Sequence, residues 1–432
     1  MKKKLLLIIS LFLTAQVIQS QTVVLDANGV TVKWTGTTVP SPYFVQANPR
    51  GTGMEWFAIV DNSTKSNITN YANNIASGRT YFTPTGESSP IPFNNIVTTL
   101  VTDMSYMFSN ATTFNQPIGS WGVNNVTNMV GMFNNATAFN QPIGSWNVGN
   151  VTTMNSMFVN AVSFNQPIGS WNVSNVTAMN SVFFGTAFNQ PIGSWNVNNV
   201  TTMNSMFAYA TAFNQNISSW NVSNVTYMNA MFYSATDFNQ PIGSWNVSNV
   251  ITMSYMFSNV TAFNQPIGSW NVGNVTTMTD MLLGTRLSTA NYDDLLIGWS
   301  TISPNESPLK PNLYFSAGNS KYCNGASARA SIISTYGWAI TDGGQEANCV
   351  LDTNEFDTND FKLYPNPVVS VLNVKTENNL INQPYTIIDG LGRVVLNGKL
   401  NEVDSTINVE QLSKGIYYLK VSGNSASKFI KE

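Results

Sequence analysis

Histidine is absent from this chain of 432 residues, and charged residues make up only 9% of it. Because histidine is the side chain whose ordinary pKa lies near neutral pH, its absence removes the usual acid or base of an enzyme. It also removes the common partner of cysteine in a zinc site. The net charge of −3 and the lack of a basic cluster argue against a nucleic-acid partner, since Lys and Arg bind phosphates.

Charge is scarcest in the middle of the chain, where Asp237 is the sole charged residue in the range 104–279. That stretch therefore lacks the pair of carboxylates that glycoside hydrolysis requires. Asp293 and Asp294 are adjacent further on, but neighbours on a helix do not face one another. We predict a protein that is not an enzyme and has no catalytic, cofactor-binding or metal-binding residues.

Long hydrophobic runs are also missing. The apolar stretch at residues 5–13 is too short to cross about 30 Å of hydrocarbon. It follows Lys2, Lys3 and Lys4 and precedes the small residue Ser20, so residues 1–20 are typical of a secretory signal peptide. No later segment is long or apolar enough to span a bilayer, so we expect no transmembrane segment after signal removal.

The chain has two cysteines, Cys323 and Cys349. Export to an oxidising compartment favours a disulfide between them, which would stabilise the fold by about 3 kcal/mol. Two free thiols and half of a metal site are the alternatives. The absence of histidine counts against the metal site.

One motif, FNQPIGSWNVxNVTxMxxMFxxAxx, repeats through the middle of the chain. Its tryptophans recur in five steps of 25 residues and one of 24, and they are Trp121, Trp146, Trp171, Trp195, Trp220, Trp245 and Trp270. Self-similarity at such a period indicates stacked structural units, each of which contacts its neighbours. We therefore predict a repeat solenoid over residues 101–280.

Each unit contains two apolar patterns. Ile143, Trp146 and Val148 have the L-x-x-L-x-L spacing of the strand in a leucine-rich repeat, which turns Trp146 and Val148 toward the core. The apolar residues that follow have the spacing of one helix face: Val151, Met154, Met157, Phe158 and Ala161. The predicted fold is a solenoid of leucine-rich-repeat type, with a short parallel strand and a helical turn in each 25-residue repeat.

Asparagine occupies two places around the predicted strand. One series lies four residues after each tryptophan and is expected to satisfy backbone groups in the turn and to stack as a ladder. The alternative is glycosylation, because Asn150-Val151-Thr152 has the form of an acceptor site. The other series follows the tryptophan directly and is predicted to form a concave binding face: Asn147, Asn172, Asn196, Asn221, Asn246 and Asn271.

This face is neutral and nearly identical from unit to unit. It suits a repeating partner such as a polysaccharide, or no partner, better than a small ligand that needs a unique pocket. The tryptophans are expected in the core, with a sugar-stacking platform as the alternative. Side chains vary more on the predicted helix face, where Tyr227 and Tyr255 lie.

The pattern VTxMxxMFxxAxxFNxxIxxW over residues 101–279 resembles the BspA-like leucine-rich-repeat surface proteins of bacteria. The resemblance implies an exported protein without enzymatic activity, and several proteins of this family are linked to adhesion or host contact. It supplies no binding residues.

The flanks are expected to cover the ends of the solenoid. Residues 21–100 are predicted to form a β-rich amino-terminal cap, with strands near 29–34 and 54–60. Residues 281–350 are predicted to form a carboxy-terminal cap with the disulfide, a helix at 292–299 and strands at 313–315 and 338–340. Residues 351–360 are interpreted as an acidic linker, with a calcium site as the alternative.

Residues 361–432 contain short apolar runs separated by turn signals, which predict a small all-β sandwich. Asn397-Gly398 is expected to form a hairpin turn. Three short motifs resemble the type A sorting domain of type IX secretion, and their residues are Tyr364, Pro365, Asn366, Pro367, Gly390, Gly392, Gly415 and Tyr417. The resemblance implies the type IX secretion machinery as a partner. It also implies release from, or display on, the outer-membrane exterior of a Gram-negative bacterium.

The sequence thus favours a secreted or cell-surface interaction protein that adheres to a glycan, matrix or cell-surface protein through its solenoid. The alternative is a passive spacer or surface-layer component without a specific ligand. Ice binding is disfavoured because Thr152, Thr177 and Thr201 are expected to begin the helical segment rather than to lie on a flat strand face.

Overall fold

The computed structural model describes residues 22–73, 81–301, 307–347, 349, 361–376, 381–389, 393–421 and 427–432. The predicted signal peptide at 1–20 and the predicted linker at 351–360 lie outside the described residues. The chain divides into two compact units, residues 1–347 and 348–432. The described part is mostly β or irregular, with few helices.

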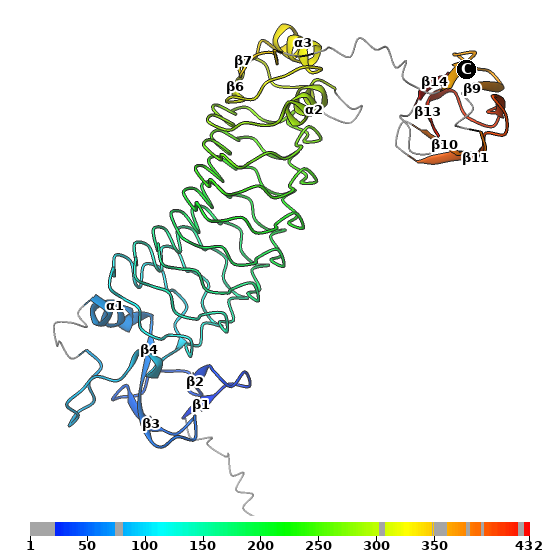
Figure 1. Ribbon diagram of the computed structural model, residues 1–432. Coiled ribbons are helices and arrows are strands. Elements are labelled where there is room, and N and C mark those ends of the chain that lie inside the picture. The colour runs from blue at the N-terminus through cyan, green and yellow to red at the C-terminus, as the bar shows by residue number, and fades with distance from the viewer. Residues whose placement is uncertain are drawn as a thin grey trace, which may run out of the picture. The chain divides into compact units, whose positions relative to one another are not determined.

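The amino-terminal cap is built from two small sheets (Figure 1). Strands β1 (Val23–Leu25) and β2 (Val32–Trp34) pair antiparallel. Strands β3 (Phe44–Ala47), β4 (Glu55–Asp61) and β5 (Ile96–Leu100) form the second sheet, in which β4 and β5 run parallel. Both predicted strands are confirmed as β2 and β4, and the helix α1 (Lys65–Asn73) was not predicted.

The repeats form coils that stack one on another (Figure 1, cyan to green). No helix and no strand of regular length lies between β5 and residue 289, a stretch that the structure describes completely. The coils are instead joined by isolated parallel bridges, which run in series from Asp103–Asn128 to Thr252–Thr277. The predicted strand plus helical turn in each repeat is therefore wrong, and the bridges lie at the start of the segment predicted to be helical. We call this stack, over residues 101–287, the solenoid.

Hydrogen bonding explains why the predicted helix does not form. The alternate N–H groups of Met154, Ser156, Phe158 and Asn160 donate to carbonyl oxygens of the next coil, at N···O distances between 2.7 and 3.2 Å. Ser156 and Asn160 have φ angles of 57° and 53°, a left-handed conformation that interrupts a right-handed helix. The segment is a spiral of tight turns whose polar backbone is shared between coils.

The two left-handed positions recur in every coil, and neither holds a β-branched residue. One series consists of Tyr106, Gly131, Ser156, Ser181, Ser205, Ala230, Tyr255 and Asp280, and the other of Asn110, Asn135, Asn160, Gly185, Tyr209, Ser234, Asn259 and Gly284. Glycine and asparagine are the residues that adopt this conformation most readily. The sequence thus specifies the turns, although its apolar spacing imitates a helix.

The solenoid core consists of ladders of identical side chains. Trp146 is 3% exposed, its ring stacks on that of Trp171 with 6.4 Å between centroids, and its Nε1 donates to the carbonyl of Ile118 in the preceding coil at 3.1 Å. Phe133 and Phe158 stack similarly at 5.4 Å. The core role of the tryptophans is confirmed, and burial excludes the sugar-stacking alternative for them.

The carboxy-terminal cap extends the series of parallel bridges through Met278 and Phe315, and it also contains helices. It contains α2 (Thr289–Ser300), β6 (Tyr314–Ser316), α3 (Ala326–Tyr336) and β7 (Ala339–Thr341), and β6 and β7 pair parallel. The predicted helix and both strands are confirmed, and α3 was not predicted. Cys323 and Cys349 are both disulfide-bonded, as expected.

The carboxy-terminal unit is an all-β module, as predicted. One antiparallel sheet contains β8 (Phe361–Tyr364), β9 (Val371–Thr376) and β12 (Asp404–Asn408). The other contains β10 (Pro384–Asp389), β11 (Val394–Lys399), β13 (Gly415–Val421) and β14 (Ser427–Lys431). Both sheets contribute to one core.

The hairpin predicted at Asn397-Gly398 is wrong, because both residues lie within β11 and pair with β10. A Cβ atom at Gly398 would lie 2.7 Å from the Tyr385 hydroxyl. This glycine therefore makes room for a neighbouring ring, rather than providing a turn.

Candidate binding surface on the solenoid

The predicted binding face is a row of asparagines. Five of its members are exposed and Asn271 is half-buried. In each, the side-chain Oδ1 accepts the backbone N–H two residues further on, as in Asn172 with Ser174 at 3.1 Å. The row therefore lies at the surface, but the oxygen of each side-chain amide already accepts a hydrogen bond that holds a local turn.

The other asparagine series joins consecutive coils. The Nδ2 of Asn249 donates to the carbonyl oxygen of Ser223 at 2.7 Å, and the same bond recurs at every member: Asn125, Asn150, Asn175, Asn199, Asn224, Asn249 and Asn274. The predicted structural ladder is confirmed. Nothing in the described part of the chain donates to the Oδ1 of Asn249, so that acceptor faces solvent.

A row of threonines runs beside this asparagine row. Each threonine hydroxyl donates to a carbonyl oxygen of the preceding coil, as in Thr226 with Thr201 at 3.0 Å and Thr276 with Ile251 at 3.1 Å. Its members are Thr127, Thr152, Thr177, Thr201, Thr226 and Thr276, and Ile251 occupies the equivalent place in one coil. We did not predict this row, although the recurrence of threonine two residues after every asparagine except Asn249 was a visible signal.

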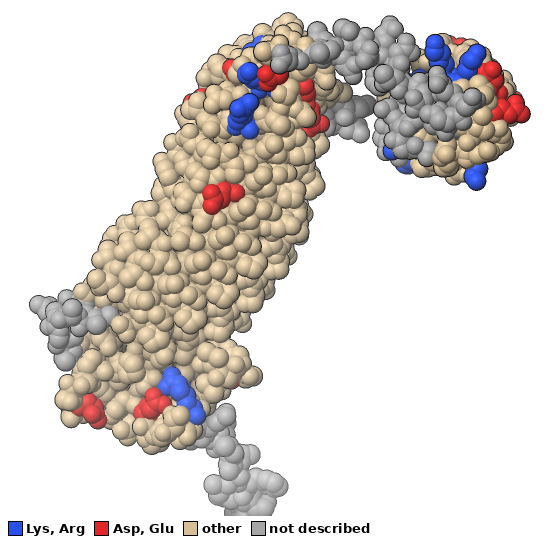
Figure 2. Space-filling model, viewed as in Figure 1, with Lys and Arg blue, Asp and Glu red and all other residues tan. Residues whose placement is uncertain are grey.

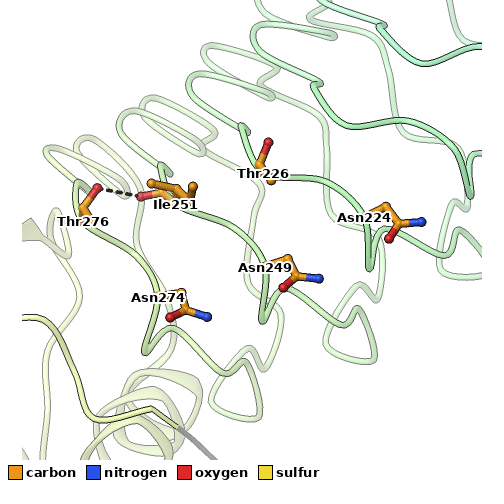
Figure 3. Close-up of a pocket in the computed structure, with 6 residues that line it drawn as sticks. All are labelled: Asn224, Thr226, Asn249, Ile251, Asn274 and Thr276. Carbon is orange, nitrogen blue, oxygen red and sulfur yellow. Dashed lines mark hydrogen bonds between the residues drawn. The ribbon is translucent and has the colours of Figure 1, made fainter.

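The two rows border a shallow groove of about 460 Å³, which Figure 3 shows over three coils. Its lining residues are Asn224, Thr226, Asn249, Ile251, Asn274 and Thr276. The predicted binding asparagines do not line this groove, and Asn271 lines a separate small cleft. The groove is therefore formed by rows adjacent to the predicted face.

The chemistry of the surface is neutral and repetitive. Figure 2 shows a solenoid face almost without charged side chains, with charge gathered towards its ends. Parallel coils repeat at about 4.8 Å, so amide oxygens and methyl groups line the groove at that interval. Such a surface can hydrogen-bond the hydroxyl groups of an uncharged polymer that extends along the stack.

The carboxy-terminal cap holds the clearest electrostatic cluster. Tyr292 donates to Asp342 at 2.8 Å, and Arg329 pairs with the same carboxylate at 2.6 Å. Burial and the Asp342 charge raise the pKa of Tyr292 far above its ordinary value. Asp293 accepts three backbone N–H groups, from Cys323, Asn324 and Gly325. These groups hold α2 against the start of α3 and form no open site.

The sorting motif residues have structural partners in the carboxy-terminal unit. Tyr364 ends β8 and donates to Asp404, while Asn366 binds β14 by accepting the Ile430 N–H at 2.8 Å. Tyr417 is buried and donates to the Ser413 carbonyl. Of the remaining residues, Pro365 and Pro367 flank Asn366 and Gly415 begins β13, whereas Gly390 and Gly392 lie outside the described residues.

Two further properties bear on function. Over the described ranges, no helix is both long and apolar enough to cross a membrane. Over the same ranges, no group of three Cys, Asp or Glu side chains is arranged to hold a metal ion.

Comparisons with known proteins concern both units. The family described as "Mycoplasma protein of unknown function, DUF285" matches residues 79–191 and 179–294, which together span half of the chain. The family described as "Secretion system C-terminal sorting domain" matches residues 362–432. No curated protein and no solved structure matches this chain.

Proposed function

The chain belongs to the family described as "Mycoplasma protein of unknown function, DUF285", and from this premise we propose that it is an exported protein that binds a neutral glycan through its solenoid. The sorting domain at residues 362–432 points to a secreted or cell-surface protein of a Gram-negative bacterium. That domain also implies contact with the secretion machinery. The glycan, display on the outer-membrane exterior and the lack of enzymatic activity are parts of the proposal.

Kinship with the BspA-like leucine-rich-repeat surface proteins is also part of the proposal. The VTxMxxMFxxAxxFN pattern supports it, and so does the match of the DUF285 family to the same residues. Because the coils lack a regular strand and helix, the kinship rests on the sequence pattern rather than on the geometry of a typical leucine-rich repeat.

The observation that carries the proposal is the groove between the asparagine and threonine rows. It is open, neutral and built from positions that repeat in every coil. A small ligand needs a concave pocket that encloses it, whereas a linear polymer can make the same weak contact at many coils. Repeated weak contacts then add up to stable adhesion.

The test is binding of the full chain to neutral polysaccharides, matrix proteins and intact cells. Replacing Thr226 and Thr276 with arginine would fill the groove and add charge to it. We expect saturable binding by the wild type and at least about tenfold weaker binding by T226R/T276R.

A matched control places the same two charges elsewhere on the surface. Thr236 is half-buried and Thr261 is exposed, like Thr226 and Thr276, and the hydroxyls of both also donate to the preceding coil. T236R/T261R should bind like the wild type. Absence of binding to every glycan, matrix protein and cell type would overturn the proposal in favour of the passive spacer, and equal loss in both variants would remove the groove from it.

Ice binding was disfavoured for a reason that does not hold, because the threonines do not begin a helix. The threonine row is nevertheless interrupted by Ile251 and borders a groove rather than a flat face. We therefore do not propose this function. Absence of thermal hysteresis is the result expected.

A further inference from the structure

Aromatic side chains gather at one place on the solenoid surface. Tyr209 and Tyr255 are 47% and 42% exposed, and Phe184 and Tyr233 are half-buried beside them. The ring centroids of Phe184 and Tyr209 are 5.2 Å apart, those of Tyr209 and Tyr233 are 5.1 Å apart, and those of Tyr233 and Tyr255 are 6.5 Å apart. Successive coils thus contribute rings to one continuous cluster.

Tyrosine is uncommon at the left-handed positions of the solenoid, where outside the cluster it occurs at Tyr106 in the first coil. Tyr209 and Tyr255 occupy the two left-handed positions, with φ angles of 58° and 60°. Asparagine, glycine and serine fill most of the equivalent positions, because a bulky side chain is strained there. Because Tyr106 shares this conformation, the feature that marks the cluster as a candidate site is the contact between exposed rings on successive coils, together with the strain at Tyr209 and Tyr255.

The rings surround a hollow of about 330 Å³, with Ser205, Ala208 and Ala230 among its lining residues. These small side chains leave the hollow open between the rings. Its volume is at the lower end of the range for ligand pockets, which is sufficient for one or two sugar rings.

The chemistry of the hollow selects among small partners. No Lys, Arg, Asp or Glu lines it, so nothing there recognises an ion. A tyrosine offers an apolar face together with a hydroxyl that donates and accepts. A pyranose ring has matching features, because its C–H groups lie on its faces and its hydroxyls lie around its edge.

We propose that the cluster of Phe184, Tyr209, Tyr233 and Tyr255 is a sugar-binding hollow that stacks one or two pyranose rings of a neutral glycan. This hollow shares no residue with the groove between the asparagine and threonine rows. The inference takes the neutral glycan as ligand class from the proposed function, whereas the hollow itself is argued from its own residues.

The experiment titrates the full chain with neutral hexasaccharides of β-1,4-linked glucose, mannose and N-acetylglucosamine and of α-1,4-linked glucose, by calorimetry up to about 10 mM. The test variants are Y209S and Y255S. Serine occupies the equivalent positions at Ser234 and Ser205, so both variants should fold. The control is Y106S, because Tyr106 has the same position in the first coil as Tyr255 but lies outside the cluster.

At least one oligosaccharide should bind, and Y209S and Y255S should each weaken that binding about tenfold, while Y106S leaves it unchanged. Failure of all four oligosaccharides to bind, or equal binding by Y209S, would overturn the inference. If T226R/T276R abolishes binding to polymers while Y209S does not, the hollow is refuted and the proposed function stands. If Y209S weakens oligosaccharide binding while T226R/T276R has no effect on polymer binding, the hollow stands and the groove is refuted.

Discussion

Neighbouring segments are held together by different kinds of side chain in the solenoid and in the amino-terminal cap. In the cap, ion pairs join loops to strands, as Asp26 after β1 pairs with Lys33 in β2 and Arg50 pairs with Glu55 in β4. In residues 104–279 there is only one charged residue, and asparagine, glutamine and threonine join the coils. A charge at the same place in every coil would stack like charges about 4.8 Å apart. An amide both donates and accepts, so identical amides can stack without repulsion.

The surface of the solenoid is therefore neutral because its coils are nearly identical, and identical charges on adjacent coils would repel. Asn140 shows how the rule operates, because its N–H donates to Asn115 Oδ1, and its own Oδ1 accepts from Gln166 in the next coil. At the carboxy-terminal end, Asn291 at the start of α2 donates to Asn264 and ends this ladder. Charged residues return where the neighbours are no longer identical.

The largest effect should come from breaking the core of the solenoid. Trp195 is 3% exposed, and its Nε1 donates to the Ile168 carbonyl. W195A should lower the free energy of unfolding by about 3–5 kcal/mol, because it leaves a large cavity and an unpaired carbonyl. Urea unfolding followed by circular dichroism measures this.

A conservative control separates volume from hydrogen bonding. W195F retains most of the ring volume and should lose less stability than W195A. If W195A unfolds at the same urea concentration as the wild type, the tryptophan ladder does not hold the coils together.

Acid should weaken the cap more than the solenoid. The hydrogen bond from Lys33 lowers the pKa of Asp26, and that from the Ser63 hydroxyl lowers the pKa of Asp61, both from the ordinary value of 3.8. Because the folded-state pKa values are depressed, the stability from these carboxylates is present above pH 3.8 and is lost as the pH falls below it.

The melting temperature at pH 6 and pH 3 tests this asymmetry. The wild type should lose stability on acidification, and D26N/D61N should lose less, because it lacks the two titrating groups. The change should be modest, since these groups are partly exposed. An equal loss in both proteins would mean that acid acts elsewhere.

Much of the solenoid could be predicted from sequence, because period and burial are simple consequences of repetition. The seven tryptophans mark the core and the recurring asparagines mark the ladder. The local conformation could not be derived from apolar spacing alone, since Met154, Met157 and Phe158 match a helix and a spiral of turns equally well. Ser156 and Asn160 held the distinguishing signal, because residues that tolerate a positive φ recur at both positions.

The candidate sites were harder to predict. The asparagine face predicted beside the tryptophans is present, but each of its Oδ1 atoms holds a turn. The aromatic hollow is made by Phe184, Tyr209, Tyr233 and Tyr255, which occupy three different places in the repeat. Only the stacking of coils brings such residues together, so the sequence showed variety at Tyr255 without showing a cluster.

The central claim is that each repeat is a spiral of tight turns, with two residues in the left-handed conformation, that shares its backbone hydrogen bonds with its neighbours. The most direct test compares the stability of S156G and S156A by urea unfolding. At a φ of 57° glycine is unstrained and alanine is not, so S156G should be more stable than S156A by about 0.5–1 kcal/mol. In a right-handed helix alanine is favoured over glycine by about 1 kcal/mol, so the opposite order of stability would contradict the account.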